Sequence, residues 1–91
     1  MKAVDELHLN GIKVFASEMK AEKKVFDCNF KEPCAIVMGS EEKGIYPALM
    51  KICDEQFKIP MANNFESLNV SVATGIILYE ALKQRMVKES C

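Results

Sequence analysis

The sequence predicts an α/β domain in which a parallel sheet is flanked by helices. Segments with the spacing of amphipathic helices alternate with short β-branched and aromatic segments along the chain, which is typical of this fold class. One apolar run, residues 33–38, is continuous, as expected of a strand that is covered on both faces. Polar loops follow two of the strand candidates, and loops at the carboxyl ends of strands form the ligand crevice of open α/β sheets.

The first elements are a helix and a strand. Residues 3–9 have helical spacing and end at Asn10-Gly11, which is a helix stop signal. Residues 12–16 are short, β-branched and aromatic, which indicates a strand. A helix, an Asn-Gly turn and a strand form the second half of a βαβ unit. We therefore expect that N-terminal strands of the sheet are missing, and that either these strands or a second subunit complete it.

Residues 17–31 are polar and irregular. They contain three closely spaced lysines, Lys20, Lys23 and Lys24. We interpret the segment as a solvated loop, with contact to RNA phosphates as the less favoured alternative. Three apolar residues are expected to hold it against the rest of the domain: Val25, Phe26 and Phe30.

The second half of the chain continues the alternation. The strand over residues 33–38 is followed by a helix over residues 45–53, with Pro47 in its first turn. Residues 56–59 are the third strand, and residues 68–88 form a long terminal helix. The apolar stripe of this helix is broad enough to cover the sheet and to leave room for a partner subunit.

Composition limits the class of protein. The chain has 91 residues, of which 49% are hydrophobic, and we expect residues 1–91 to form a single domain. Its formal net charge is -1, so no overall attraction draws it to nucleic acid, although a local basic patch is compatible with this balance. No apolar run is long enough to cross a membrane and no signal peptide is recognised, so we expect a soluble, cytoplasmic protein.

The cysteines do not have the spacing of a metal site. No two of them stand in a C-x-x-C arrangement and no histidine lies near them, so zinc is not expected. Cys34 and Cys53 fall in regular apolar segments and are interpreted as reduced core thiols, which favours a reducing compartment. The other two are Cys28 and Cys91.

The loop over residues 39–44, Gly-Ser-Glu-Glu-Lys-Gly, fits neither a P-loop nor a dinucleotide fingerprint. Gly39 allows a tight turn in which the backbone comes close to a ligand. Glu41 lies at the strand exit, where it could orient a substrate or hold an arginine. The alternative for Glu41 is a solvated turn.

Small polar residues also crowd the start of the terminal helix, where backbone N–H groups have no helical partner: Ser67, Asn69 and Ser71. Asn69 can donate and accept hydrogen bonds at once, and its alternative is a helix-capping role. His8, the one histidine, stands among polar residues of a helix. We interpret it as a surface residue and not as a catalytic base.

Three motifs together resemble one known family. They are Val37-Met38-Gly39-Ser40-Glu41 with Gly44 three positions on, Ile59-Pro60-Met61, and Ser67-Leu68-Asn69-Val70-Ser71-Val72-Ala73. In this order and spacing they strongly resemble the SpoU family of RNA 2′-O-ribose methyltransferases, which belongs to the SPOUT superfamily. The resemblance covers the whole chain and the C-terminal part of the family's domain.

The resemblance implies a fold, a cofactor and a reaction. The fold is the SPOUT-type α/β trefoil knot, and the cofactor is S-adenosylmethionine, which is held in the knot largely by backbone groups. The reaction is attack of a ribose 2′-oxygen of tRNA or rRNA on the methyl carbon of the cofactor, with no metal required.

Site residues are implied in the same way. The implied cofactor-binding residues are Met38, Gly39, Gly44, Ile59, Pro60, Met61, Ser67, Leu68 and Asn69. The implied catalytic residues are Glu41 and Asn69. Because SPOUT enzymes generally dimerise through helices beside the knot, a homodimer is also implied. The candidate interface is the apolar face around Ile76, Tyr79 and Leu82.

One part of the family's pattern has no counterpart among these residues. The family's first motif contains an arginine that contacts the RNA and helps to activate the ribose hydroxyl, whereas Arg85, the one arginine here, lies far along the terminal helix. The resemblance therefore implies the cofactor-binding half of the enzyme and puts methyl transfer by this chain alone in doubt. Two alternatives stay open: a catalytically inactive module of the same fold that binds S-adenosylmethionine or RNA, and an interaction domain that shares only ancestry with the family.

Overall fold

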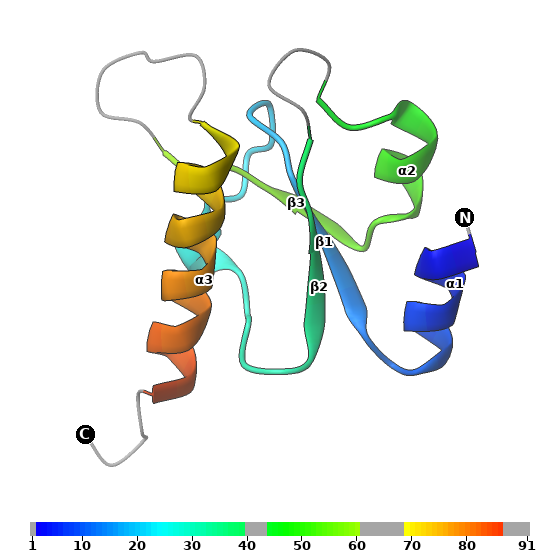
Figure 1. The fold of residues 1–91 in the computed structure, drawn as a ribbon, viewed down its shortest axis with the longest axis horizontal. Helices are drawn as coiled ribbons and strands as arrows, with labels where there is room; N and C mark the ends of the chain where they lie inside the picture. The colour runs from blue at the N-terminus through cyan, green and yellow to red at the C-terminus, as the bar shows by residue number, and fades with distance from the viewer. Residues whose placement is uncertain (1, 40–43, 61–68, 87–91) are drawn as a thin grey trace.

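The computed structural model describes residues 2–39, 44–60 and 69–86, and Figure 1 shows their fold. The elements in chain order are α1 (Lys2–Leu9), β1 (Lys13–Ser17), the 3₁₀ turn η1 (Val25–Asp27), β2 (Cys34–Val37), α2 (Pro47–Ile52), β3 (Glu55–Phe57) and α3 (Val70–Met86). Each helix and strand that the sequence predicts is present, with slightly different ends. The turn η1 was not predicted.

The strands form one parallel sheet in the order β2-β1-β3. Strand β1 is central because it pairs with both neighbours: Phe15 lies opposite Ile36 of β2 and opposite Glu55 of β3. The three middle residues of β1 are buried. The predicted α/β class is thus confirmed. The knot stays a prediction, because residues 61–68 lie outside the described part of the chain.

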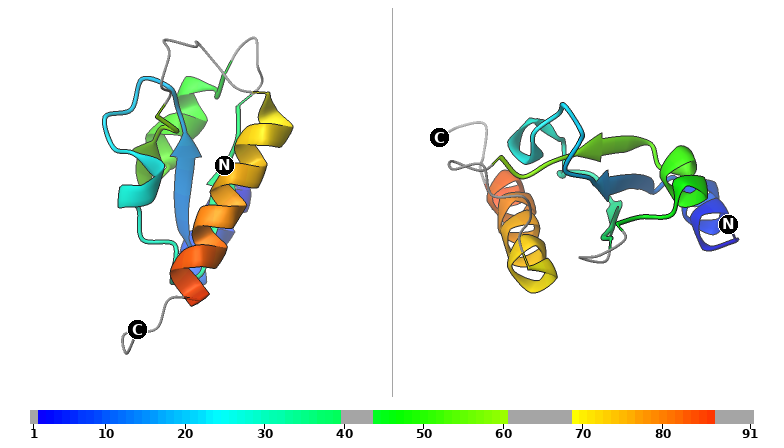
Figure 2. Two further views of the ribbon diagram at one scale, coloured as in Figure 1. Left: turned by 90° about the vertical axis from the view of Figure 1, so that its left-hand side faces the viewer. Right: turned by 90° about the horizontal axis from the view of Figure 1, so that it is seen from above.

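Helices cover the sheet on two sides. Helix α3 lies on one side of it, and α1 and α2 lie on the other (Figures 1 and 2). Successive side chains of a strand point to opposite faces, so the side chain of Phe15 faces α3, where it joins a core cluster with Ile77. On the other side, Val4 of α1 is buried. This layering leaves the strand ends free to carry loops.

Three phenylalanine rings form the centre of the core. The centroids of Phe15 and Phe30 lie 5.0 Å apart and those of Phe30 and Phe57 lie 5.7 Å apart, in edge-to-face geometry. Phe15 and Phe57 complete the triangle at 6.3 Å. Such pairs add about 0.5–1.5 kcal/mol beyond the area that they bury.

The segment over residues 17–31 contributes to this core. Val25 and Phe30 are buried as predicted, whereas Phe26 is 54% exposed and the prediction for it was wrong. In the tight turn η1 neighbouring side chains point in different directions, so only one of two adjacent apolar residues can face the core. The lysines Lys20, Lys23 and Lys24 are exposed, in keeping with a solvated outer surface.

The far end of α3 fastens this segment. Gln84 Oε1 accepts the backbone N–H of Phe30 at 2.7 Å, and Gln84 Nε2 donates to the carbonyl of Cys28 at 2.9 Å. Arg85 Nε donates to the carbonyl of Phe30 at 2.9 Å, and Arg85 Nη2 donates to the carbonyl of Glu32 at 3.2 Å. The guanidinium of Arg85 therefore serves the fold.

Two further predictions about burial were wrong. The run over residues 33–38 was predicted to be covered on both faces, but every residue of β2 is half-buried. Strand β2 lies at an edge of the described sheet, and the buried strand is β1, because only β1 has a neighbour on each side.

The cysteines are also placed differently. Cys34 and Cys53 are half-buried, whereas Cys28 is 3% exposed and lies in the core. Desolvation raises the pKa of the Cys28 thiol to about 11. Burial likewise raises the pKa of Cys53. Both thiols therefore stay protonated near neutral pH, which makes them poor nucleophiles.

The outer face of α3 exposes large apolar side chains. Tyr79 is 69% exposed, Leu82 53% and Ile76 37%. Ala73 and Ile77 form the opposite, buried face. In the part of the chain that the structure describes, no helix has both the length and the apolar character that crossing a bilayer requires.

Candidate functional site

The candidate site lies where the parallel strands end. The carboxyl ends of β2 and β3 and the first turn of α3 lie toward the same end of the molecule (Figures 1 and 2). Met38 and Gly39 follow β2 directly, and Ile59 and Pro60 follow β3 shortly after its end. Asn69 precedes α3. Segments far apart in the sequence thus supply neighbouring parts of one site, as the crevice of an α/β sheet requires.

Gly39 and Gly44 close the base of a loop. A Cβ atom on Gly39 would lie 2.5 Å from the carbonyl carbon of Gly44 and 2.9 Å from the nitrogen of Ile45. Both are backbone atoms, which cannot rotate out of the way. Gly44 itself has φ +69°, a left-handed conformation that favours glycine. The two glycines that the family resemblance singles out therefore meet each other.

An open pocket of about 310 Å³ lies between β2 and α3. Its lining is Cys34, Ile36, Met38, Thr74, Ile77 and Leu78. The lining is mostly apolar, and the Thr74 hydroxyl adds a hydrogen-bonding group from the first turns of α3. Pockets of this size and character suit part of a small organic ligand, with the polar group fixing its orientation. Of the predicted site residues that the structure describes, Met38 lines this pocket.

Asn69 caps α3. Its side-chain Oδ1 accepts the backbone N–H of Ser71 at 2.8 Å, and its carbonyl accepts the N–H of Ala73 at 2.9 Å. The capping alternative is therefore realised. Capping uses the amide oxygen only, and no described residue accepts a hydrogen bond from the amide nitrogen. What Asn69 has left to offer a ligand is hydrogen-bond donation.

The other predicted site residues divide into two groups. Ile59 and Met38 are half-buried and pack against the core cluster from the strand ends, whereas Pro60 is exposed. Four predicted residues lie outside the described part of the chain: Glu41, Met61, Ser67 and Leu68. Their places in the site stay predictions.

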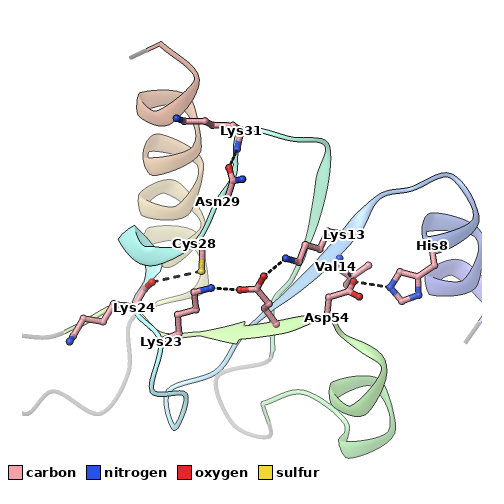
Figure 3. Close-up of polar contacts among 10 residues, drawn as sticks. His8, Lys13, Val14, Lys23, Lys24, Cys28, Asn29, Lys31 and Asp54 are labelled. Atoms are coloured by element: carbon pink, nitrogen blue, oxygen red, sulfur yellow. Dashed lines mark hydrogen bonds and ion pairs between the residues drawn. The ribbon is translucent and has the colours of Figure 1, made fainter. Parts of the chain in front are cut away.

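A second polar cluster, at the start of β3, was not predicted (Figure 3). Asp54 Oδ2 accepts the backbone N–H of Val14 at 2.7 Å and contacts His8 Nε2 at 2.8 Å. These two hydrogen bonds, that from Val14 first, lower the pKa of Asp54. His8 is exposed, so its predicted surface position is confirmed.

Glu55 completes this cluster. It forms ion pairs with Lys13 and Lys23, which lower the pKa of Glu55 (Figure 3). The cluster ties α1, β1 and the segment over residues 17–31 to the start of β3. Since it stands away from the strand ends that carry the site, we assign it to the fold and not to chemistry.

Comparison with known proteins gives the family. A family model described as the SpoU rRNA Methylase family matches residues 1–79. The chain belongs to this family. The 23S rRNA (guanosine-2′-O-)-methyltransferase RlmB of Ralstonia nicotianae is 42% identical over 86 residues, which are 94% of this chain and 34% of that protein.

Solved structures of SpoU proteins agree with the fold. The TrmH/SpoU tRNA modifying enzyme of A. aeolicus has a TM-score of 0.84 at 38% identity, over 92% of this chain and 43% of its own. The SpoU methyltransferase AviRb from Streptomyces viridochromogenes, in complex with the cofactor AdoMet, has a TM-score of 0.83 at 34% identity, over 94% and 35%. The chain spans about a third of the length of the curated relatives it matches.

Proposed function

We propose that this SpoU chain is the cofactor-binding portion of an RNA 2′-O-ribose methyltransferase that acts on tRNA or rRNA. The observation that carries the proposal is the convergence of the segments after β2, after β3 and before α3 at one end of the sheet. Relatives named as rRNA and tRNA 2′-O-methyltransferases support the reaction. The AviRb complex supports S-adenosylmethionine as the cofactor.

The described residues fit this cofactor. The mostly apolar pocket beside Met38 suits the flat face of an adenine. The backbone around Gly39 and Gly44 suits close contact, because neither residue has a side chain in the way. We propose that these residues hold the cofactor together with Ile59, Pro60, Met61, Ser67, Leu68 and Asn69. When bound, S-adenosylmethionine supplies a methyl group activated by its sulfonium.

The protein's task in such a reaction is to position and polarise the ribose hydroxyl. We propose that the amide nitrogen of Asn69 donates a hydrogen bond in the site and that Glu41 orients the substrate. Arg85 lies near the far end of α3 and donates hydrogen bonds to the carbonyls of Phe30 and Glu32, so we do not assign it to the ribose hydroxyl. An arginine in that role has to come from outside these 91 residues.

We also propose that the rest of such a domain adds strands beside β2. Among the described residues, β2 pairs with β1 and has no second neighbour. Its half-buried apolar residues and the adjoining pocket are suited to be covered by such strands.

An inactive binding module of the same fold is the second candidate, because this portion of the domain lacks the arginine that helps to activate the ribose hydroxyl. A 2′-O-methylation assay on bulk RNA that compares a protein carrying the whole SpoU domain with this chain separates the two candidates.

Asn69 provides the test of cofactor binding. In calorimetric titration with S-adenosylhomocysteine, we expect saturable binding that weakens about tenfold in Asn69→Ala, since a hydrogen bond is worth about 1–1.5 kcal/mol. Asn69→Ala also removes the helix cap, which costs about 1 kcal/mol of stability. Asn69→Ser is the matched control, because serine keeps the cap without the amide. Full affinity in Asn69→Ser would contradict a direct role for the amide in binding.

We further propose a cytoplasmic homodimer that associates through the outer face of α3. The exposed side chains of Ile76, Tyr79 and Leu82 supply the apolar area. Light scattering at micromolar concentration is expected to give the mass of a dimer, and Tyr79→Asp is expected to give that of a monomer. A monomeric wild-type chain would overturn this proposal.

A further inference from the structure

The segment over residues 17–31 extends the sheet beside the cofactor-binding segment. The backbone N–H of Lys58 donates to the carbonyl of Lys23 at 2.8 Å, and the N–H of Val25 donates to the carbonyl of Lys58 at 2.8 Å. Lys24 and Lys58 are thereby paired in a parallel bridge. Two lysines that are distant in the sequence thus stand opposite each other just beyond the end of β3.

The described part of the protein does not neutralise this lysine pair. Residues directly opposite in a bridge place their side chains on the same face, and like charges in that arrangement are destabilising. Within the described ranges, no carboxylate forms an ion pair with Lys24 or Lys58. The neighbouring Lys23 differs, because its ammonium is paired with Glu55, and Figure 3 shows Lys24 extending away from that pair.

The position of the pair indicates its partner. Lys58 directly precedes Ile59 and Pro60, the segment that we assign to the cofactor. The formal net charge of the chain is -1, so binding of a polyanion has to depend on local groups such as this one. Glu22 and Asp27 are exposed in the same loop and offset part of its positive charge. The charge that remains at the lysine pair therefore suits one anionic group.

We propose that Lys24 and Lys58 together bind one backbone phosphate of the substrate RNA and so position the RNA beside the cofactor. This inference rests on the proposed function. A phosphate between the two ammonium groups offsets their repulsion. Contacts of this kind fix the register of the nucleic acid and carry no sequence information.

The test is fluorescence anisotropy with a fluorescein-labelled RNA hairpin, measured over a series of salt concentrations. The double variant Lys24→Gln/Lys58→Gln is expected to bind about five- to tenfold more weakly at low salt. The slope of log affinity against log salt is expected to fall by about 0.7–0.9, the value for one phosphate contact. Lys23→Gln is the matched control for the single variant Lys24→Gln, because each removes one charge from the same loop, but Lys23 is already paired with Glu55.

Several outcomes overturn the inference. A loss of RNA affinity in Lys23→Gln equal to that in Lys24→Gln would show a response to net charge alone. Unchanged RNA affinity in the double variant, or a wild-type chain that binds no RNA, would overturn the proposed phosphate site. Thermal unfolding checks that the variants are folded, and we expect the melting temperature to hold or rise because a repulsion is removed. Lys24 is exposed, so Lys24→Gln alone keeps the test valid if the double variant unfolds.

A parallel titration with S-adenosylhomocysteine separates this inference from the proposed function. The double variant is expected to bind that ligand with unchanged affinity. Cofactor binding without any effect of the lysines on RNA would overturn the phosphate site alone. Failure of the wild-type chain to bind S-adenosylhomocysteine would count against the proposed function.

Discussion

Gly39→Ala is expected to lower the free energy of unfolding by about 1–3 kcal/mol, the usual cost of forcing a methyl group into filled space. The same change is expected to weaken S-adenosylhomocysteine binding at least tenfold. The added Cβ would lie 2.5 Å from the carbonyl carbon and 2.8 Å from the Cα of Gly44. Because these are backbone atoms, the clash is relieved only if the base of the loop moves away from the cofactor-binding residues. The free energy of unfolding and the affinity for S-adenosylhomocysteine are therefore expected to fall together.

Two other glycines give the controls. Gly75 lies in α3, where an added Cβ atom would meet nothing within 4 Å, so Gly75→Ala is expected to stabilise the helix by about 0.5–1 kcal/mol. A Cβ atom on Gly44 would also meet nothing within 4 Å, but the residue has φ +69°. Gly44→Ala is therefore expected to lower the free energy of unfolding by about 1–2 kcal/mol, the cost of this backbone conformation for alanine. Urea denaturation and calorimetric titration measure the series. Unchanged cofactor affinity in Gly39→Ala would show that the loop base does not shape the binding site.

Local sequence signals were sufficient for the elements of the fold. Asn10-Gly11 marks the end of α1, and Pro47 marks the first turn of α2. The signals for both are carried by a few adjacent residues, because helix stops and first turns depend on local backbone preferences. Motif spacing likewise singled out Gly39 and Asn69, and the structure gives both a specific backbone task at the site.

Features that depend on contacts across the fold were not predictable. The run that contains β2 is the more continuous apolar one, yet β1 is the buried strand, because strand order decides which strand has two neighbours. Thr74 and Leu78 line the pocket only because α3 faces β2 across it. The pairing of Lys24 with Lys58 also depends on how the loop returns to the sheet. No periodicity in the sequence encodes these relations.

Phe15→Ala is expected to have the largest effect on stability, a loss of about 3–5 kcal/mol of unfolding free energy. Phe15 is fully buried in the central strand and contacts the rings of both Phe30 and Phe57. Small domains have about 5–15 kcal/mol in total, so this one truncation removes a large share. The chain contains no tryptophan, and far-ultraviolet circular dichroism in urea is the suitable measurement.

The matched control for Phe15→Ala is Phe26→Ala. It deletes the same ring from a residue that is 54% exposed, so its effect is expected to stay within about 0.5 kcal/mol. The comparison tests more than hydrophobicity, because the phenylalanine triangle joins the sheet to the loop that carries Lys24. If the triangle holds that loop in place, Phe15→Ala should weaken RNA binding more than Phe26→Ala does under conditions in which both variants are folded. Equal stability losses in the two alanine variants would contradict the assignment of the core.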